Sequence, residues 1–156
     1  MHDPPVAFFL TWTTYGSWLP GDDRWWTESY RGKHPPNFQL RKQSQSRMTE
    51  SALTLAPDQR ILVATTIAEH CTFRSWHLWT LNVRTNHVHV VVTSAEHPDK
   101  IVGQFKAWCT RKLKELASHE QAGYVREKWW TEGASTIYLN DQEDLEGAVI
   151  YVRDCQ

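Results

Sequence analysis

The residues best suited to chemistry lie in the segment Asn86–Val92, which reads Asn-His-Val-His-Val-Val-Val. Side chains alternate between the two faces of a strand, so His87 and His89 should point one way and Val88 the other. Two residues of rise, roughly 6.6 Å, allow both imidazoles to converge on one ion at about 2.1 Å from each nitrogen. The spacing favours a metal site, although two solvent-facing histidines on a strand would show the same pattern.

A second candidate is Tyr151, near the end of the chain. If this segment is a helix with Leu145 facing the core, Tyr151 lies about 120° from Leu145, at the border of the apolar sector. A tyrosine at that border is either a packing residue with a solvent-exposed hydroxyl or a reactive phenol. The pKa of a free tyrosine is about 10, so its phenol attacks at neutral pH only with the help of a metal or a base.

The elements that would position these residues follow from periodicity and turn signals. Strands are predicted at Val6–Thr14, Ser75–Val83, His87–Thr93 and Ser135–Leu139. Helices are predicted from Pro57 to about Cys71, from about Asp99 to Ala117, and from a cap at Asn140-Asp141 to the end of the chain. This order favours an α+β fold in which helices pack on one face of a mainly antiparallel sheet.

Composition limits the classes of function. The chain has 156 residues, which suits a single domain over 1–156. Its formal net charge of −1 excludes a protein whose whole surface is basic, so any surface that binds nucleic acid must be a local patch. Three widely spaced cysteines argue against a disulfide framework and a cysteine zinc knuckle, and the apolar run Val6–Leu10 is too short for a signal peptide or membrane span. We therefore expect a cytoplasmic protein that does not enter a membrane.

The stretch from Asp22 to Pro57 has little periodicity and reads as a long loop. It mixes aromatic and basic side chains: Arg24, Trp25, Trp26, Tyr30, Arg31, Lys33, Arg41, Lys42 and Arg47. Such a mixture suits unpaired bases and phosphates, because each stacked base contributes roughly 1–3 kcal/mol. The same residues could instead pack on the sheet and solvate the loop. Two further features are equally ambiguous, the basic face Lys106, Arg111 and Lys114 and the pair Trp129-Trp130, which could pack under the last helix or touch DNA.

Taken in order along the chain, four stretches carry a family resemblance. They are Leu10–Asp22, Asn86–Val92, Trp129–Thr131 and Ala148–Val152 followed by the final Gln156. The histidine–hydrophobic–histidine strand with one tyrosine on a late helix resembles the HUH single-tyrosine nucleases. The ordered set more closely resembles the REP-associated tyrosine transposases, relatives of the small insertion-sequence transposases. With this resemblance we expect a ferredoxin-like or RRM-like domain.

The resemblance implies cleavage and rejoining of single-stranded, hairpin-bearing DNA, similar to repetitive extragenic palindromes, without ATP. Tyr151 would be the nucleophile and would leave a 5′-phosphotyrosine and a free 3′-hydroxyl. His87 and His89 would hold Mg²⁺ or Mn²⁺. Relatives include monomers and homodimers whose active sites are shared between subunits, so the resemblance leaves a homodimer open.

The third metal ligand is the point at which the sequence departs from the family pattern. Relatives commonly carry Gln or Asn four residues after the tyrosine, where this chain has Cys155. Asp154 lies about 60° from Tyr151 around a regular helix, whereas Gln156 lies about 140° away. Resemblance favours Gln156, which could reach the site if the helix end unwinds, and simple geometry favours Asp154.

Two other classes of function fit the same residues. One is a single-stranded or hairpin nucleic-acid-binding module that performs no chemistry, as the displaced third ligand would suggest. The other is a metal-dependent hydrolase that activates water and forms no covalent intermediate.

Overall fold

The computed structural model describes residues 3–17, 26–28, 32–34, 39, 42–43, 46–120 and 123–154, with the side chains of 26–28 and 32–34 left out of the description. The strands are β1 (Ala7–Thr13), β2 (Trp26–Glu28), β3 (Gly32–His34), β4 (His77–Val83), β5 (His87–Thr93) and β6 (Ser135–Leu139). The helices are α2 (Pro57–Arg74), α3 (Pro98–His119) and α4 (Gln142–Asp154).

The main sheet has four antiparallel strands in the order β4-β5-β1-β6. The chain passes through β1, α2, β4, β5, α3 and β6, which is the β-α-β-β-α-β arrangement of ferredoxin-like folds. The predicted α+β, antiparallel, ferredoxin-like fold is therefore confirmed. The strand with the histidines, β5, lies in the interior of the sheet between β4 and β1.

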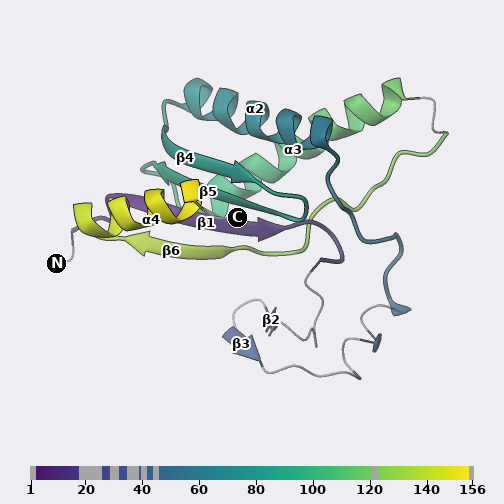
Figure 1. The fold of residues 1–156 in the computed structure, drawn as a ribbon, viewed down its shortest axis with the longest axis horizontal. Coiled ribbons are helices and arrows are strands. Elements are labelled where there is room, and N and C mark those ends of the chain that lie inside the picture. The colour runs from purple at the N-terminus through teal and green to yellow at the C-terminus, as the bar shows by residue number, and fades with distance from the viewer. Residues whose placement is uncertain are drawn as a thin grey trace.

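The sheet is covered on both faces. Helices α2 and α3 lie together on one face, and α4, in yellow, lies across the other (Figure 1). The larger core belongs to the first face and includes Leu10, Trp12, Val88 and Phe105. We expected all helices on one face, and that holds for α2 and α3 only. The position of α4 follows from a second apolar cluster on the opposite face: Ala7, Val91, Leu139, Leu145, Ala148 and Val152.

Local signals place the helix ends near their predicted positions. Pro57 occupies the first turn of α2, and the backbone N–H of Ala56 donates to Oε1 of Gln59 at 2.8 Å. The predicted cap of the last helix is present, because the carboxylate of Asp141 accepts from the N–H of Asp144 at 2.8 Å. Helix α2 extends three residues beyond the predicted end at Cys71 and stops where Ser75 adopts a left-handed conformation.

The segment predicted to be one long loop contains regular structure. Strands β2 and β3 pair antiparallel as a separate two-stranded sheet, which the sequence did not indicate. Within the described part of the chain, Cys71 and Cys109 are buried and form no disulfide. None of the described helices is long and apolar enough to cross a membrane.

Gly16 is a position where the backbone requires glycine. Its φ is +81°, and a Cβ there would lie 2.6 Å from Cε of Met48 and 2.8 Å from Cβ of Ala52. We expect Gly16→Ala to lower the free energy of unfolding by about 2–4 kcal/mol, through backbone strain and overpacking. Urea unfolding measures this value.

Gly103 supplies the matched control. It lies on α3, and a methyl group added there would have nothing within 4 Å, so Gly103→Ala should be neutral or stabilising by up to about 1 kcal/mol. Equal stabilities of the two variants would contradict the steric requirement at Gly16.

Candidate active site

The two histidines of β5 point to the face of the sheet that carries α4. His89 pairs with Thr11 and His87 with Thr13 on the neighbouring strand β1, while Val88 and Val90 are buried in the larger core on the other face. The ring centroids of the two histidines are 4.7 Å apart. His89 is only 7% exposed, and the rings of Tyr151 on α4 and Phe9 on β1 lie against it. The predicted convergence of the two imidazoles on one face is confirmed.

Each imidazole has its Nδ1 beside an oxygen. Nδ1 of His87 lies 2.8 Å from Oδ1 of Asn86, and Nδ1 of His89 lies 2.8 Å from Oγ1 of Thr11. An amide oxygen only accepts, so Nδ1 of His87 is the donor in this contact. Histidines that ligate a metal generally hold their other nitrogen in this way, which orients the ring. The pair therefore fits the requirements of a divalent cation.

Tyr151 reaches this face from α4. The helix docks on the sheet through Leu145, Ala148 and Val152, all of which are buried. Tyr151 lies at the edge of that buried stripe and is 56% exposed. Its ring centroid is 6.0 Å from that of His89 and 5.8 Å from that of Phe9. A phenol and two imidazoles from segments about sixty residues apart thus meet within one chain.

Gln156 and Asp154 are the two residues proposed as the third ligand. Gln156 lies outside the described residues, as does Cys155, which occupies the usual family position. Asp154 is exposed, and its carboxylate accepts from Nε of Arg153 at 3.1 Å. Across the described ranges, no three His, Cys, Asp or Glu side chains are grouped so that they could hold a metal ion. Asp154 therefore does not join the two imidazoles in this arrangement, and the choice of Gln156 stays a prediction.

Burial makes His89 a weak base. Desolvation, followed by the charges of His87 and Arg84, lowers the pKa of His89 from 6.5 to about 4. The ring is therefore neutral at physiological pH, which is the form that binds a metal.

This shift predicts a pH-dependent stability of the metal-free protein. Between pH 6.5 and 4 the unfolded chain takes up a proton at His89 that the folded chain does not, so stability falls as the pH falls. Through this residue we expect a loss of up to about 3 kcal/mol by pH 4. Chemical unfolding of wild type and His89→Gln across this range measures the difference. The exposed His77, substituted by Gln, should leave the wild-type pH profile unchanged, and identical profiles for all three proteins would contradict the prediction.

The sequence of the chain matches a known family. Residues 48–154 match the family described as "Transposase IS200 like", which is more than half of the chain and includes both histidines and Tyr151. The chain belongs to the IS200-like transposase family. No curated protein matches it.

Two solved structures share the fold of this IS200-like transposase. One is described as a REP-associated tyrosine transposase bound to a REP hairpin, with 12% identity and a TM-score of 0.53, and the match covers 97% of this chain and 67% of that one. The other, from Deinococcus radiodurans R1 and assigned as a transposase, has 12% identity and a TM-score of 0.54. That match covers 98% of this chain and 92% of the other. Both support the ferredoxin-like arrangement of this family member.

Most of the predicted DNA-contacting residues of the transposase fall outside the described residues. Arg24, Trp25, Tyr30, Arg31 and Arg41 lie in ranges that the structure does not describe. Trp26 lies in β2 and Lys33 in β3, with their side chains outside the description, while Lys42 and Arg47 are exposed. Their role in DNA binding stays a prediction.

The cations of α3 have partners within the fold. Nζ of Lys106 donates to the carbonyls of Thr131 and Gly133 at 2.9 and 2.7 Å, and Lys114 pairs with Glu127 at 3.0 Å. Lys106 therefore anchors the loop before β6.

The tryptophan pair does not pack under the terminal helix. Trp129 is buried in the larger core on the α2/α3 face, and Nε1 of Trp130 donates to Thr110 of α3 at 3.0 Å. Their position follows from the backbone pairing of Trp130 with Thr14, which ties this segment to the end of β1.

Three residues around the reactive side chains were not predicted from the sequence. Phe9 touches the rings of both His89 and Tyr151, Thr11 holds His89, and Asn82 of β4 donates to the α4 backbone. Strand alternation in β1 could have placed Phe9 and Thr11 on one face, opposite Leu10. Their contact with the histidines depends on the β1–β5 register, which the alternation does not specify.

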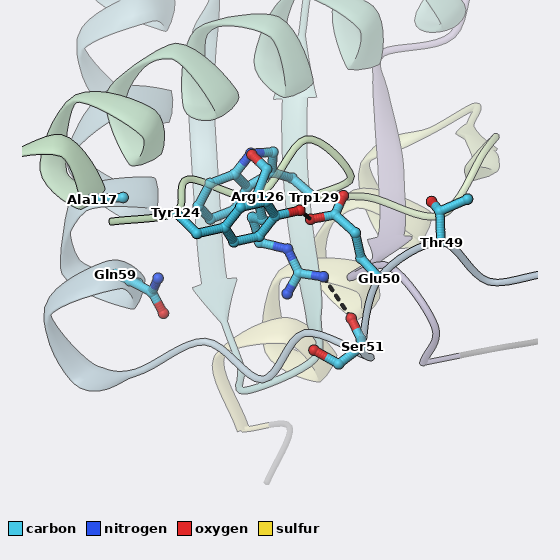
Figure 2. A pocket seen from close by; sticks show the side chains of 8 residues that line it. All are labelled: Thr49, Glu50, Ser51, Gln59, Ala117, Tyr124, Arg126 and Trp129. Carbon is cyan, nitrogen blue, oxygen red and sulfur yellow. Dashed lines mark hydrogen bonds between the residues drawn. The ribbon is translucent and has the colours of Figure 1, made fainter. Parts of the chain in front are cut away.

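A separate polar cavity of about 490 Å³ lies between the start of α2, the end of α3 and the segment before Trp129 (Figure 2). Three of its polar side chains are hydrogen-bonded to one another or to the backbone around the cavity. Glu50 accepts from the hydroxyl of Tyr124 at 2.5 Å and from the N–H of Glu127 at 3.0 Å, and Arg126 donates to the carbonyl of Ser51. The cavity has none of the histidine or Tyr151 side chains, so it is distinct from the candidate active site.

Proposed function

We propose that this chain is a metal-dependent, single-tyrosine DNA strand transferase acting on single-stranded DNA that carries hairpins. The observation that supports it best is the position of Tyr151 beside His89, with His87 on the same face. Membership of the IS200-like transposase family supports DNA strand transfer as the class of reaction. The solved relative bound to a REP hairpin supports a hairpin as the substrate.

In the proposed reaction the phenolic oxygen of Tyr151 attacks the phosphorus of the scissile phosphodiester. The bond between phosphorus and the 3′ oxygen breaks, a 5′-phosphotyrosine forms, and the phenolic proton ends on the released 3′ oxygen. Attack by a 3′-hydroxyl on the phosphotyrosine reverses these steps and rejoins the strand, so no nucleotide cofactor is needed.

His87 and His89 are proposed to hold Mg²⁺ or Mn²⁺, with Gln156 as the third ligand. When bound, such an ion would polarise the phosphate as a Lewis acid. Thr11 and Asn86 would keep the two rings oriented towards it. Because the phenol and imidazoles belong to one chain, this arrangement does not require a second copy to complete it.

The test is a hairpin oligonucleotide with a single-stranded flank, labelled in separate experiments at its 5′ or its 3′ end and incubated with the protein and Mg²⁺ or Mn²⁺. The proposal expects the 3′ label to move with the protein on a denaturing gel and the 5′ label to appear on a shortened strand with a 3′-hydroxyl. Retarded DNA without any adduct in either metal would favour a binding module. Cleavage without an adduct would favour a water-activating hydrolase.

A further inference from the structure

A hydrogen bond connects the histidine side of the site to the helix that carries the tyrosine. Nδ2 of Asn82, on β4, donates to the backbone carbonyl of Val152 on α4 at 3.1 Å. Asn82 is the cross-strand neighbour of His89. Since opposed residues of an antiparallel pair point to the same face, the Asn82 side chain lies beside the His89 ring and reaches across to the helix.

The acceptor of this bond is in the last turn of α4. Asp154 is the last described residue of α4, so the carbonyl of Val152 lies in the last described turn of the helix. Carbonyls in the last turn of a helix commonly need partners from outside it, and a helix end without such partners frays. Val152 is fully buried, and Tyr151 directly precedes it, so a contact that holds Val152 also limits the movement of Tyr151.

The apolar contacts of α4 do not supply the same restraint at this end. Leu145, Ala148 and the partly buried Val149 anchor the earlier turns of the helix, and among the described residues Val152 is the one buried apolar side chain of the last turn. Tyr151 itself is more than half exposed, and among the described residues its ring contacts those of Phe9 and His89. A small rotation of the last turn would therefore move the exposed phenol away from these two rings.

We infer that Asn82 is a positioning residue that holds the last turn of α4 against β4 and thereby keeps the Tyr151 phenol beside His89. Phe9 forms the wall against which the phenol rests, at 5.8 Å between ring centroids. The assignment of a catalytic consequence rests on the proposed function, whereas the structural restraint does not.

The restraint is tested without DNA or metal by ¹⁹F NMR of protein labelled with 3-fluorotyrosine, the Tyr151 signal being assigned from its loss in Tyr151→Phe. In wild type the rings of Phe9 and His89 should shift this signal away from that of free fluorotyrosine. Asn82→Leu, which keeps the volume of the side chain but cannot donate, should move the signal towards the free value. It should also raise the hydrogen-exchange rate of the 151–154 amides by about tenfold.

Thr80→Ala is the matched control, because Thr80 lies two positions earlier on the same strand and, among the described residues, forms no side-chain hydrogen bond to α4. It should leave both readouts as in wild type. An unchanged fluorine signal and unchanged exchange in Asn82→Leu would overturn the inference, as would equal changes in the Thr80 variant. Asn82→Ala provides a second substitution if the leucine variant does not fold.

The catalytic consequence is read from the kinetics of adduct formation. Asn82→Leu should reduce kcat at saturating hairpin DNA by about 10- to 100-fold, since small displacements of a reacting group have effects of that size. The KM for DNA and the affinity for Mn²⁺ should stay within about twofold of wild type. An unchanged kcat would overturn the positioning role. If wild type itself forms no adduct, the proposed function fails, and the fluorine and exchange measurements still decide the restraint.

Discussion

Tyr151→Phe should form no covalent adduct with hairpin DNA and should lower the rate of strand cleavage by at least about 10³-fold. The substitution removes one oxygen atom from a side chain that is 56% exposed, and it keeps the ring that contacts Phe9 and His89. Fold stability and DNA affinity should therefore change little. A variant that loses the nucleophile but still binds DNA is impaired in the chemical step alone. The effect is therefore measured as the single-turnover rate at which the DNA label is transferred to the protein.

Tyr138 offers a matched control for this experiment. It lies on β6 and is 51% exposed, and it contacts Phe8 on the opposite face of the sheet from Tyr151. Tyr138→Phe removes the same atom from a similarly exposed ring and should transfer label at the wild-type rate. If the Tyr151 variant cleaves as fast as wild type, Tyr151 is not the nucleophile. Cleavage that persists without an adduct would instead support the water-activating hydrolase.

His89→Ala and His87→Ala should each lower the rate of adduct formation by at least about 100-fold and weaken Mn²⁺ binding. Each substitution removes one of two imidazoles whose Nδ1 atoms are already held by oxygen partners. A phosphate that loses this electrophilic assistance has a barrier higher by several kcal/mol. Rates at increasing Mn²⁺ concentrations measure the effect, and calorimetric titration of Mn²⁺ provides a readout that does not depend on activity. Addition of EDTA to wild type should likewise stop adduct formation.

His77→Ala is the control for these variants. It tests whether the effect comes from losing a metal ligand or from losing any histidine of the sheet. His77 is exposed at the far end of β4, where it pairs with Thr93 and contacts the Trp79 ring. This variant should bind Mn²⁺ and form the adduct as wild type does. Wild-type activity in both His87→Ala and His89→Ala would show that these histidines are not metal ligands needed for the reaction. Wild-type Mn²⁺ affinity with lost activity would show that the histidines act by another route.

Local sequence signals predicted the elements well because each depends on neighbours in the chain. Alternation in Asn86–Val92 places the histidines on one face of β5, and Pro57 and Asp141 mark helix starts that the structure confirms. The pairing of β2 with β3 was missed, since three-residue strands leave almost no periodic pattern. The roles of Gln156 and of the basic and aromatic residues of the 22–57 segment stay predictions.

The apolar pattern of α4 did not predict which face of the sheet the helix covers. Its apolar stripe shows that Leu145, Ala148 and Val152 are buried, but such a stripe does not tell which surface buries it. The apolar residue Val91 lies on the same face of β5 as His89, and it could have indicated that a helix covers this face too. A strand that is apolar on both faces is expected to be covered on both.

Residue types and spacing along this chain established two converging imidazoles, a phenol at the border of a helix and the α+β order of the elements, because strand and helix periodicities are properties of short segments. The meeting of Tyr151 with His89, and the links made by Phe9, Thr11 and Asn82, came only from strand register and helix docking. Those arrangements depend on apolar surfaces far apart in sequence becoming buried together, and no local pattern encodes that pairing.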